Sequence, residues 1–435
     1  MLKRLEKHLK KKFSFLKNSN IILAVSGGID SVVMTHLMKN TNYNCSLAHC
    51  NFKLRESESE LDESFVEELG KQLDFPVHTI SFNTISYAKE NKISIQMAAR
   101  NLRYQWFEKL AKETNADYIF TAHHKDDVLE TFLINFTRGT GLDGLTGIPE
   151  INGKIIRPLL IFEREDIANY AKENNISWRE DKSNSSTKYF RNKIRHTIVP
   201  VLKDLNPNLL KSFDSTLVNL QESQTLVKDR IRHLKKHVVS YEENETIRIS
   251  IKKILELNNP KAHLYELLKP YNFTAWKDVV NLLNAQSGKQ LFSKTHRLIK
   301  DRDELILTNS ESNSDLGCLI NEKTEKIEKP ISLTLEKVDV LGDSDKNSIY
   351  IDKALLKFPL TVRKWEKGDY FYPIGMQGKK KLSKYFKDEK MSLLEKENTW
   401  LLCSDNEIVW IIGKRLDNRY KTTNKTLSIL KIDFN

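Results

Sequence analysis

The amino-acid sequence predicts an α/β protein whose N-terminal part is a doubly wound parallel sheet. Between residue 20 and about residue 125, short apolar runs alternate with segments in which apolar residues recur every three or four positions. This alternation of strands and helices is typical of a parallel sheet with helices on both faces. Such sheets bind ligands beyond the carboxyl ends of their strands, so functional residues are expected directly after each apolar run.

Four strands and four helices are predicted in this part of the chain. An apolar run at 21–25 begins the pattern, and a helical stretch at 31–39 follows it. In the second helix, Leu61, Phe65, Leu69 and Leu73 are predicted to share one face. The other strands are predicted at 45–50, 77–82 and 117–122, and the other helices at 95–110 and 126–137.

Three domains are expected, because 435 residues are too many for one ordinary domain. They are an α/β domain at 1–205, a mainly helical domain at 206–330 and a small, basic α+β domain at 331–435. A hairpin-like segment at 296–307 and a polar connection at 309–330 close the middle domain. Strand-like runs at 360–362 and 408–412 lie in the last domain.

The charge of the chain favours a nucleic-acid partner. The formal net charge is +12 and the isoelectric point is near 9.2. Part of the excess of Lys and Arg lies in residues 357–435. A basic balance favours an anionic partner. A soluble protein that is merely rich in lysine is the alternative, and charge alone does not separate the two.

The cysteines and the apolar segments exclude several classes of protein. Cys45, Cys50, Cys318 and Cys403 form no C-x-x-C pair, so a zinc ribbon, an iron–sulfur site or a disulfide framework has no support. The basic N-terminus lacks the apolar core of a signal peptide. No apolar run reaches the ~18 residues of a membrane span. We therefore expect a soluble, cytoplasmic protein with no membrane segment.

The first predicted strand ends in the sequence Ser26-Gly27-Gly28-Ile29-Asp30-Ser31, and a helix follows at once. Two glycines let the backbone approach a ligand, and free amides at a helix N-terminus favour an anion. The serines add hydroxyl groups, and Asp30 is suited to hold Mg²⁺ between phosphate oxygens. An ordinary Gly-Gly turn is the alternative, but the full pattern favours binding of a pyrophosphate. The pattern is neither a Walker A loop nor G-x-G-x-x-G.

Polar clusters also follow the second and the fourth predicted strands, at 49–55 and 121–131. The second cluster contains His123-His124 followed by two aspartates. Metal ligation by this cluster is conceivable. We rank it below a role in substrate binding, because no further ligands show the spacing of a zinc site.

Carboxylates and arginines complete the set of candidate site residues. Glu130 lies three residues after Asp127 and four after Asp126, so either spacing places two carboxylates on one helix face. A solvated acidic first turn is the alternative, but a neighbouring nucleotide loop favours binding of an ammonium group. Arg100 and Arg103, on another predicted helix, are either surface residues or groups that neutralise a phosphate or an adenylate.

Read in order, these segments resemble the tRNA(Ile)-lysidine synthetase family of the PP-loop ATP pyrophosphatase superfamily. The resemblance covers the N-terminal half almost continuously and resumes in the last ninety or so residues, whereas 205–345 matches loosely. Phe52 and Met97 depart from the family pattern, in which a histidine and a glutamate are frequent. The matching segments are 26–31, 49–55, 98–104, 121–131, 138–148, 157–160, 180–184, 191–202, 362–375 and 379–388.

The resemblance implies an ATP-dependent ligase that forms a carbon–nitrogen bond. Its reaction joins L-lysine to the wobble cytidine of the minor isoleucine tRNA, which has a CAU anticodon. ATP first adenylylates the cytosine 2-carbonyl oxygen with loss of pyrophosphate. The ε-amine of lysine then attacks the activated carbon, AMP leaves, and lysidine results. An ammonium group with a pKa of ~10.4 is not nucleophilic until it loses a proton, so a base is required nearby.

The resemblance also implies a role for each candidate residue. Residues Ser26, Gly27, Gly28, Ile29, Asp30 and Ser31 would bind ATP, and Asp30 would place Mg²⁺. Arg100 or Arg103 would stabilise charge during adenylyl transfer, while Asp127 and Glu130 would bind the lysine ammonium group. In this reading, the domain at 1–205 is catalytic and the two others contact tRNA. The basic residues expected to bind tRNA are Arg191, Arg195, Arg363, Lys364, Lys379, Lys380 and Lys381.

Three other functions are compatible with parts of the pattern. An enzyme that thiolates a tRNA base would need reactive or cluster-binding cysteines, and only Cys50 lies near the candidate site. An amidating ligase for small molecules would have little use for a basic C-terminal domain. An RNA-binding protein without activity would not need Asp30, Asp127 and Glu130. The sequence does not fix the oligomeric state, and a homodimer is one option.

Overall fold

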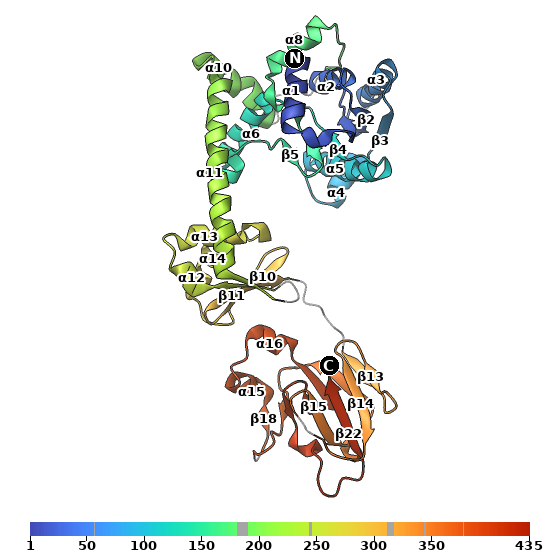
Figure 1. The fold of residues 1–435 in the computed structure, drawn as a ribbon, viewed down its shortest axis with the longest axis vertical. Coiled ribbons are helices and arrows are strands. Elements are labelled where there is room, and N and C mark those ends of the chain that lie inside the picture. Colours follow the sequence, from blue (N-terminus) through green and yellow to red (C-terminus); the bar gives the residue numbers. More distant parts are fainter. Residues whose placement is uncertain (56, 181–189, 243–245, 311–316, 343–344, 377) are drawn as a thin grey trace. The chain divides into compact units, whose positions relative to one another are not determined.

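The computed structural model describes residues 1–55, 57–180, 190–242, 246–310, 317–342, 345–376 and 378–435. The chain forms two compact units, Met1–Lys228 and Asp229–Asn435. Figure 1 shows the first unit as a sheet with helices on both sides, followed by the long helix α11 (Leu209–Val238), which continues into the second unit. Among the described residues, no helix combines the length and the apolar character that crossing a membrane requires.

The sheet of the first unit confirms the predicted parallel α/β fold. Its six strands lie in the order β3-β2-β1-β4-β6-β5, and every neighbouring pair is parallel except β5 with β6. The four predicted strands are all present, and β5 and β6 are short additions of two residues each. The strands are β1 (Asn20–Ala24), β2 (Asn44–Asn51), β3 (Val77–Ser81), β4 (Tyr118–Phe120), β5 (Ile151–Asn152) and β6 (Ile155–Ile156).

The central strand β1 explains why helices cover both faces of this sheet. Successive side chains of a strand point to opposite faces. Ile21 and Leu23 belong to one apolar core, whereas Ile22 between them belongs to another core with Trp106 and Ile119. Each fully buried side chain of this size contributes about 1.5–3 kcal/mol to folding. The all-apolar run at 21–25 is therefore the signature of a strand that is buried from both sides.

The order of the strands creates a switch point beside β1. The chain runs outward from β1 through β2 to β3 and then crosses back to place β4 on the other side of β1. Leu23 of β1 pairs with Leu47 of β2 and with Phe120 of β4. Open α/β sheets bind their ligands at such a reversal, outside the carboxyl ends of the strands. The turn after β1 and the cluster after β4 therefore meet at this position.

The helices of the first unit include all four predicted ones. One detail differs: Leu61, predicted on the inner face, is 51% exposed, whereas Val66 and Leu69 are buried. A helical turn has 3.6 residues, so side chains spaced four residues apart point in gradually changing directions around the helix. Over several turns, such a series of positions therefore no longer faces the core. The helices are α1 (Leu2–Lys12), α2 (Ile29–Lys39), α3 (Ser57–Leu73), α4 (Thr84–Glu90), α5 (Ile95–Glu113), α6 (Lys125–Arg138), α7 (Leu142–Leu145) and α8 (Arg164–Glu173).

A second layer of helices packs against α6. It comprises α9 (Phe190–Lys193), a π-helical turn (Ile194–Ile198), α10 (Val199–Leu205) and the first part of α11. Val128 and Leu129 of α6 share a core with Ile194, Phe213 and Leu217. This packing holds the segment after residue 190 beside the acidic start of α6. Single π-helical turns often occur at functional sites.

The second unit begins with a five-stranded antiparallel sheet in the order β7-β8-β11-β10-β9. The predicted hairpin is present as β10 (His296–Asp301) and β11 (Glu304–Asn309). The segment also contains helices, as predicted, but β7, β8 and β9 are too short to show a strand pattern in the sequence. The bounds are β7 (Val239–Tyr241), β8 (Ile247–Ser250), β9 (Gln290–Phe292), α12 (Ile251–Leu255), α13 (Pro260–Leu268) and α14 (Trp276–Asn281).

The rest of the second unit is rich in strands. β16 (Leu360–Lys364) contains the first predicted strand-like run, and β20 (Glu407–Ile411) covers the second except for its last residue, Ile412. The predicted connection at 309–330 includes residues 311–316, which lie outside the described part, and two short strands. The other elements are β12 (Cys318–Ile320), β13 (Lys326–Ile327), β14 (Leu333–Val338), β15 (Ser348–Asp352), β17 (Tyr370–Phe371), β18 (Lys380–Lys381), α15 (Leu382–Asp388), α16 (Leu393–Asn398), β19 (Trp400–Ser404), β21 (Arg415–Leu416) and β22 (Ile429–Phe434).

Candidate active site

The turn between β1 and α2 is fixed by hydrogen bonds of its own serines. The hydroxyl of Ser31 accepts a hydrogen bond from the backbone N–H of Ser26 at 3.1 Å and donates one to the carbonyl of Gly28 at 2.9 Å. Gly28 is the residue that caps α2, so the turn leads directly into the helix N-terminus. The first amides of a helix have no partner within the helix and attract anions. The turn can therefore hold phosphate groups.

A distant part of the chain supports this turn. The backbone N–H of Arg179 donates a hydrogen bond to the carbonyl of Gly27 at 3.0 Å. The guanidinium group of Arg179 binds Asp62 at 2.6 Å and Glu58 at 2.7 Å, both on α3. Asp62 also binds Arg55 at 2.9 Å. This network joins the turn to α3, and no pattern in the sequence pointed to it.

Replacement of Gly27 by alanine is expected to weaken ATP binding more than it weakens the fold. Gly27 has a φ of +88°, which costs an L-residue about 1–2 kcal/mol. The nearest atoms to an added Cβ lie 3.8 and 3.9 Å away, so the strain is conformational and not steric. Relief of that strain would move the backbone that faces the phosphates. ATP affinity, measured by calorimetry, should fall by at least about tenfold.

Gly153→Ala is the matched control for this variant. Gly153 also has a positive φ, +59°, and lies in the β5–β6 turn, where an added Cβ would meet no atom within 4 Å. The two variants should lose similar free energy of unfolding in denaturant titrations. Equal ATP affinity for Gly27→Ala and the wild type would contradict the role of the turn.

Asp30 of the turn lies beside the cluster that follows β4. Its Oδ2 atom is 3.7 Å from Nε2 of His124, and the same Nε2 atom is 3.4 Å from Oδ2 of Asp127. The His124 side chain is only 1% exposed. The predicted proximity of the turn, the second histidine and the acidic helix is thus observed. Residues from two neighbouring strand ends meet at the switch point.

One carboxylate oxygen of Asp30, Oδ1, is buried and lacks a hydrogen-bond partner among the described residues. Burial raises the pKa of Asp30, His124 opposes this effect, and Asp127 adds to it. A buried carboxylate without a full set of partners favours a positive charge next to it. Mg²⁺ commonly binds one or two carboxylates together with substrate phosphates, so Asp30 fits as such a ligand.

Asp127 and Glu130 form an acidic pair, and two arginines make ion pairs with both carboxylates. Arg191 binds Asp127 at 3.0 Å and Glu130 at 2.9 Å. Arg195 binds Asp127 at 3.0 Å and Glu130 at 2.5 Å. Glu130 is 2% exposed, and the two arginines are the cations that bind its buried side chain. The structure therefore brings together two residues predicted to bind lysine and two predicted to bind tRNA.

The electrostatics of Asp127 follow from these contacts. Burial alone would raise the pKa of Asp127. His124, Arg191, His123 and the backbone N–H of His124 together outweigh burial and hold the pKa below its ordinary value. The carboxylate is therefore charged at neutral pH, and it can accept an ammonium group in place of an arginine.

Asp126 faces a different set of partners. It binds Lys203 of α10 at 2.6 Å and accepts a hydrogen bond from the backbone N–H of Arg164 at 2.9 Å. Burial would raise the pKa of Asp126, but these two groups bring it below its ordinary value. The sequence left open whether Asp126 or Asp127 is the partner of Glu130. In the structure, Asp127 and Glu130 bind the same two arginines, whereas Asp126 does not, so we take Asp127 and Glu130 as the pair. Asp126 joins α6 to α8 and α10.

His123 is a neutral side chain in this environment. Its Nδ1 atom lies 3.0 Å from the hydroxyl of Thr121. Burial lowers its pKa to about 4, although Asp127 opposes the shift. In the described part of the chain, no three His, Cys, Asp or Glu side chains are grouped so that they could hold a metal ion. Metal ligation by the His-His-Lys-Asp-Asp cluster therefore gains no support.

Arg100 and Arg103 lie on α5, where each guanidinium group lies over an aromatic ring. The Arg103 guanidinium lies 5.3 Å from the centre of the Phe52 ring, and Phe52 stacks on Phe82. Arg100 lies 4.9 Å from the centre of the Tyr104 ring. Both arginines are exposed on the surface. No described contact joins either of them to residues 26–31, so their part in adenylyl transfer stays a prediction.

The predicted tRNA-binding residues of the second unit differ in whether their side chains already contact other residues of the protein. Arg363 makes two hydrogen bonds to Asp369, at 2.9 and 2.8 Å, and Lys380 binds Asp388 at 2.8 Å. Lys364 lies 4.0 Å from the centre of the Trp400 ring. These three side chains already have partners within the unit.

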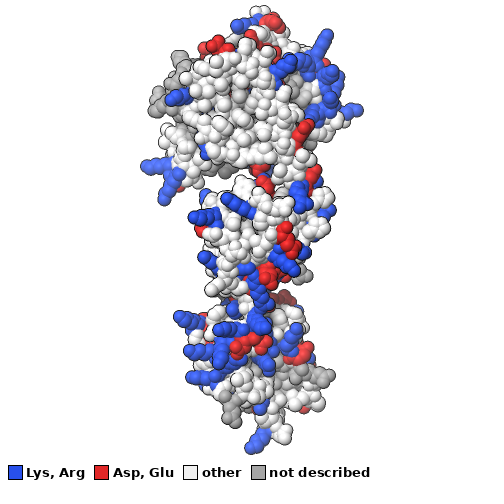
Figure 2. All heavy atoms as spheres, turned by 90° about the vertical axis from the view of Figure 1, so that its left-hand side faces the viewer, with Lys and Arg blue, Asp and Glu red and all other residues white. Residues whose placement is uncertain are grey.

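Two other lysines of this group, Lys379 and Lys381, are exposed. Lys379 lies 4.9 Å from the centre of the Tyr370 ring, which is itself partly exposed. Figure 2 shows that Lys and Arg side chains outnumber Asp and Glu on the visible face of the C-terminal part. Exposed lysines such as these suit contacts with phosphates. Of the matching segment 180–184, residues 181–184 lie outside the described part.

Comparison with known proteins identifies three family models along the chain. A PP-loop domain matches residues 1–202, a TilS substrate binding domain matches 242–310, and a TilS substrate C-terminal domain matches 360–432. The U34-tRNA thiolase NcsA of Methanococcus maripaludis, solved with its [4Fe-4S] cluster, is 18% identical. Its TM-score is 0.42 over 51% of this chain and 80% of that chain.

Full-length relatives also match. A tRNA(Ile)-lysidine synthase of Parabacteroides distasonis is 40% identical over 95% of this chain and 95% of that protein. The protein of the same name from Bacteroides thetaiotaomicron is 39% identical over 99% of both chains. That from Bacillus subtilis is 31% identical over 95% of this chain and 93% of its own. The similarity thus extends through both units.

Proposed function

The chain belongs to the tRNA(Ile)-lysidine synthase family, and from this premise we propose how its residues make lysidine. The protein is an ATP-dependent ligase that joins lysine to tRNA(Ile). One observation carries the proposal for the site: Asp30 of the turn and Asp127 of α6 converge on His124. Phosphate binding and amine binding can therefore take place side by side.

The first step is transfer of AMP to the 2-carbonyl oxygen of the wobble cytidine in the CAU anticodon. The turn 26–31 holds the ATP phosphates through backbone amides and serine hydroxyls. The cytidine oxygen attacks the α-phosphate, and pyrophosphate leaves. Asp30 would hold Mg²⁺, which would neutralise phosphate charge when bound. Arg100 and Arg103 are our candidates for stabilising charge on the transferred group, once tRNA and ATP are in place.

The second step is attack of the lysine ε-amine on the activated carbon, with AMP as the leaving group. Asp127 and Glu130 bind the ammonium group, and one of them takes its proton. Two carboxylates at one place are suited to this because each lone pair can accept an N–H of the ammonium group. Arg191 and Arg195 must give up part of their contact for lysine to enter.

RNA phosphates provide the arginines with other partners. Arg191 and Arg195 are 42% and 21% exposed, so both can reach an anion outside the protein. Guanidinium groups bind phosphate and carboxylate with similar bidentate geometry. We propose that bound tRNA draws one or both arginines toward its backbone and so opens the acidic pair to lysine. This unites the two roles predicted for these neighbouring residues.

The proposal also assigns a role to each predicted domain and bears on the oligomeric state. Residues 1–205 carry out the chemistry, and 206–330 and 331–435 contact tRNA, with Lys379 and Lys381 as the most available of the predicted contacts. Arg363, Lys364 and Lys380 would support this surface from within. All described groups of the proposed chemistry lie in the first unit, so a homodimer is not required for it. The substrate implies action in the cytoplasm.

Thiolation of a tRNA base is less compatible with the cysteines. Burial raises the pKa of Cys45 to about 12, and burial also raises that of Cys50 to about 12 although Arg103 opposes it. A thiolate is the form that attacks or binds metal. Cys50, the cysteine near the site, would be a protonated thiol at neutral pH, and Cys45 lies at the opposite end of β2, so we retain ligation of lysine as the function.

Lysidine in digested tRNA is the expected product of a direct test. The purified full chain is incubated with ATP, Mg²⁺, lysine and total tRNA, and the nucleosides are analysed by mass spectrometry. Omission of lysine should leave pyrophosphate release dependent on tRNA but abolish the modified nucleoside. A second reaction contains sulfide in place of lysine. Formation of a thiolated base there, with no lysidine in the first reaction, would overturn the proposal.

A further inference from the structure

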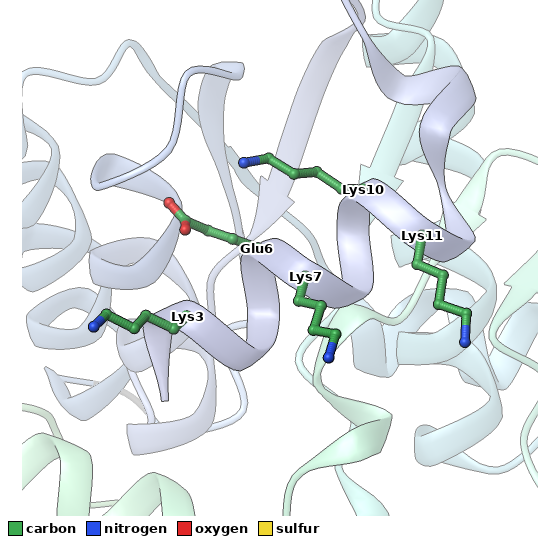
Figure 3. Close-up of a pocket in the computed structure, with 5 residues that line it drawn as sticks. All are labelled: Lys3, Glu6, Lys7, Lys10 and Lys11. Atoms are coloured by element: carbon green, nitrogen blue, oxygen red, sulfur yellow. The ribbon is translucent and has the colours of Figure 1, made fainter.

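The N-terminal helix α1 has one face that packs into the first unit and one that does not. Leu5 and Leu9 are fully buried, and Phe13 directly after the helix is also fully buried. Four exposed lysines lie along the other side of the helix. These residues, which we call the lysine stripe, are Lys3, Lys7, Lys10 and Lys11, and with Glu6 they line a surface hollow (Figure 3).

The other cationic side chains of α1 have partners in the fold. Arg4 binds Asp166 of α8 at 3.4 Å, and His8 and Lys12 lie 3.3 and 3.7 Å from Glu150. By contrast, no ion pair joins the lysine stripe to any carboxylate in the described ranges of the chain. Figure 3 shows the side chains of the stripe extending away from the helix. The helix thus separates charges that hold it in place from charges that face solvent.

Stability of the helix accounts for only part of the lysine stripe. Lys3, Lys7 and Lys11 follow each other at intervals of four residues, so their charges are neighbours on the helix surface. Like charges at this spacing destabilise a helix. Lysines in the last turn interact favourably with the helix dipole, but this does not apply to Lys3 in the first turn. Helix stability therefore accounts for Lys10 and Lys11, in the last turn, but gives no reason for Lys3 and Lys7.

The anchors of α1 connect it to residues at the functional edge of the sheet. Arg4 donates a hydrogen bond to the carbonyl of Ile161, in the segment that follows β6. Glu150, the partner of His8 and Lys12, accepts a hydrogen bond from the backbone N–H of Arg157, which directly follows β6. Because β6 is parallel to β4 and β1, these anchors lie at the same edge as the turn 26–31.

We propose that the lysine stripe of α1 binds the phosphate backbone of the tRNA whose cytidine enters the active site. This inference rests on the proposed function. Lysine is a point charge that suits phosphate contacts without reading sequence. An RNA that reaches the carboxyl edge brings a dense line of negative charge close to α1. The contact would position the tRNA and add affinity, without a role in either chemical step.

The test is tRNA affinity as a function of salt for a variant with Lys3, Lys7, Lys10 and Lys11 all replaced by glutamine. Each lost phosphate contact should reduce the slope of log K against log salt by about 0.7–0.9. We expect the slope to fall by about 2–3 and the affinity at low salt to fall about 10- to 100-fold. A variant with arginine at the same four positions should bind like the wild type, because it keeps the charges.

A matched control removes the same number of exposed charges elsewhere in the first unit. The residues replaced by glutamine are Lys71, Lys89, Lys92 and Lys112, which lie in or next to helices α3 to α5. An equal loss of affinity and slope in this control, or wild-type binding by the stripe variant, would overturn the proposal. A stripe variant that fails to fold is replaced by lysine acetylation of the wild type, in which bound tRNA should protect the stripe.

The experiment distinguishes failure of this inference from failure of the proposed function. Lysidine formation at saturating tRNA should be unchanged in the stripe variant, because no residue of the stripe belongs to the proposed ATP or lysine site. If the wild type makes no lysidine, the proposed function is wrong whatever the slopes show. If the wild type makes lysidine and the stripe variant keeps its salt slope, only the role of α1 is wrong.

Discussion

Replacement of Asp30 by asparagine is expected to lower tRNA-dependent release of pyrophosphate by about 10²- to 10³-fold, the scale seen when a preorganised charge-stabilising group is removed. The free energy of unfolding should stay constant or rise. Burial raises the pKa of Asp30, so the charged carboxylate is unfavourable in the nucleotide-free protein at neutral pH. Asparagine keeps the shape and removes that charge. Activity and stability should therefore change independently.

Asp126→Asn is the matched control, because it alters a nearby carboxylate whose pKa is shifted in the opposite direction. The pKa of Asp126 is below its ordinary value, so this group contributes stability above its unfolded pKa of ~3.9. That contribution is lost as pH falls through the lower folded pKa. Loss of its charged hydrogen bond to Lys203 should cost about 1–3 kcal/mol at pH 7. Denaturant titration of both variants at pH 7 measures the contrast.

Either of two results would contradict the role of Asp30. One is pyrophosphate release within tenfold of the wild type at saturating ATP and Mg²⁺. The other is a loss of stability in Asp30→Asn equal to that in Asp126→Asn, since activity would then fall for structural reasons. Single-turnover assays at several Mg²⁺ concentrations separate a loss of affinity for the ion from a loss of rate.

Glu130→Gln is expected to separate the two chemical steps. The efficiency of lysidine formation with respect to lysine should fall by about 10²-fold or more, since a buried charge loses its partner. Single-turnover transfer of labelled AMP from ATP to tRNA, measured without lysine, should stay within about tenfold. The amide cannot bind an ammonium group as a carboxylate does. Arg191 and Arg195 also lose a partner, so stability should fall by about 1–3 kcal/mol.

The control for this variant is Glu113→Gln, at the end of α5. Glu113 pairs with Lys109 at 3.7 Å on the surface, and exposed pairs contribute little. This change should leave both steps and the stability as they are. Wild-type efficiency of Glu130→Gln at low lysine would show that the acidic pair does not bind the substrate amine.

Much of the fold could be predicted because each strand of the parallel sheet is followed by its helix. The run at 21–25 is apolar on both faces, as expected for a buried strand. The meeting of Asp30 with His124 also followed from the sequence, since strand ends of a parallel sheet share one edge. Local patterns and one topological rule were sufficient for these inferences.

The partners of the charged residues could not be predicted, because they depend on contacts between distant segments. Nothing near Glu130 in the sequence indicates that Arg195 lies 2.5 Å away, and nothing near Gly27 indicates Arg179. Arg363 resembled a free cation in its basic segment, yet Asp369 holds it in a bidentate pair. A basic run shows which charges exist, but packing decides which of them are available to RNA.

The hydrogen bond from Arg179 to Gly27 has a consequence for biosynthesis. The turn emerges early from the ribosome, but its supporting residue is about 150 positions later. At about 5–20 residues per second, the ribosome needs roughly 8–30 s to reach it. Late in that interval, after β6 has been made, a nascent chain has the strands of the sheet without a finished nucleotide loop. Competence to use ATP should therefore arise late in translation, together with closure of the first unit.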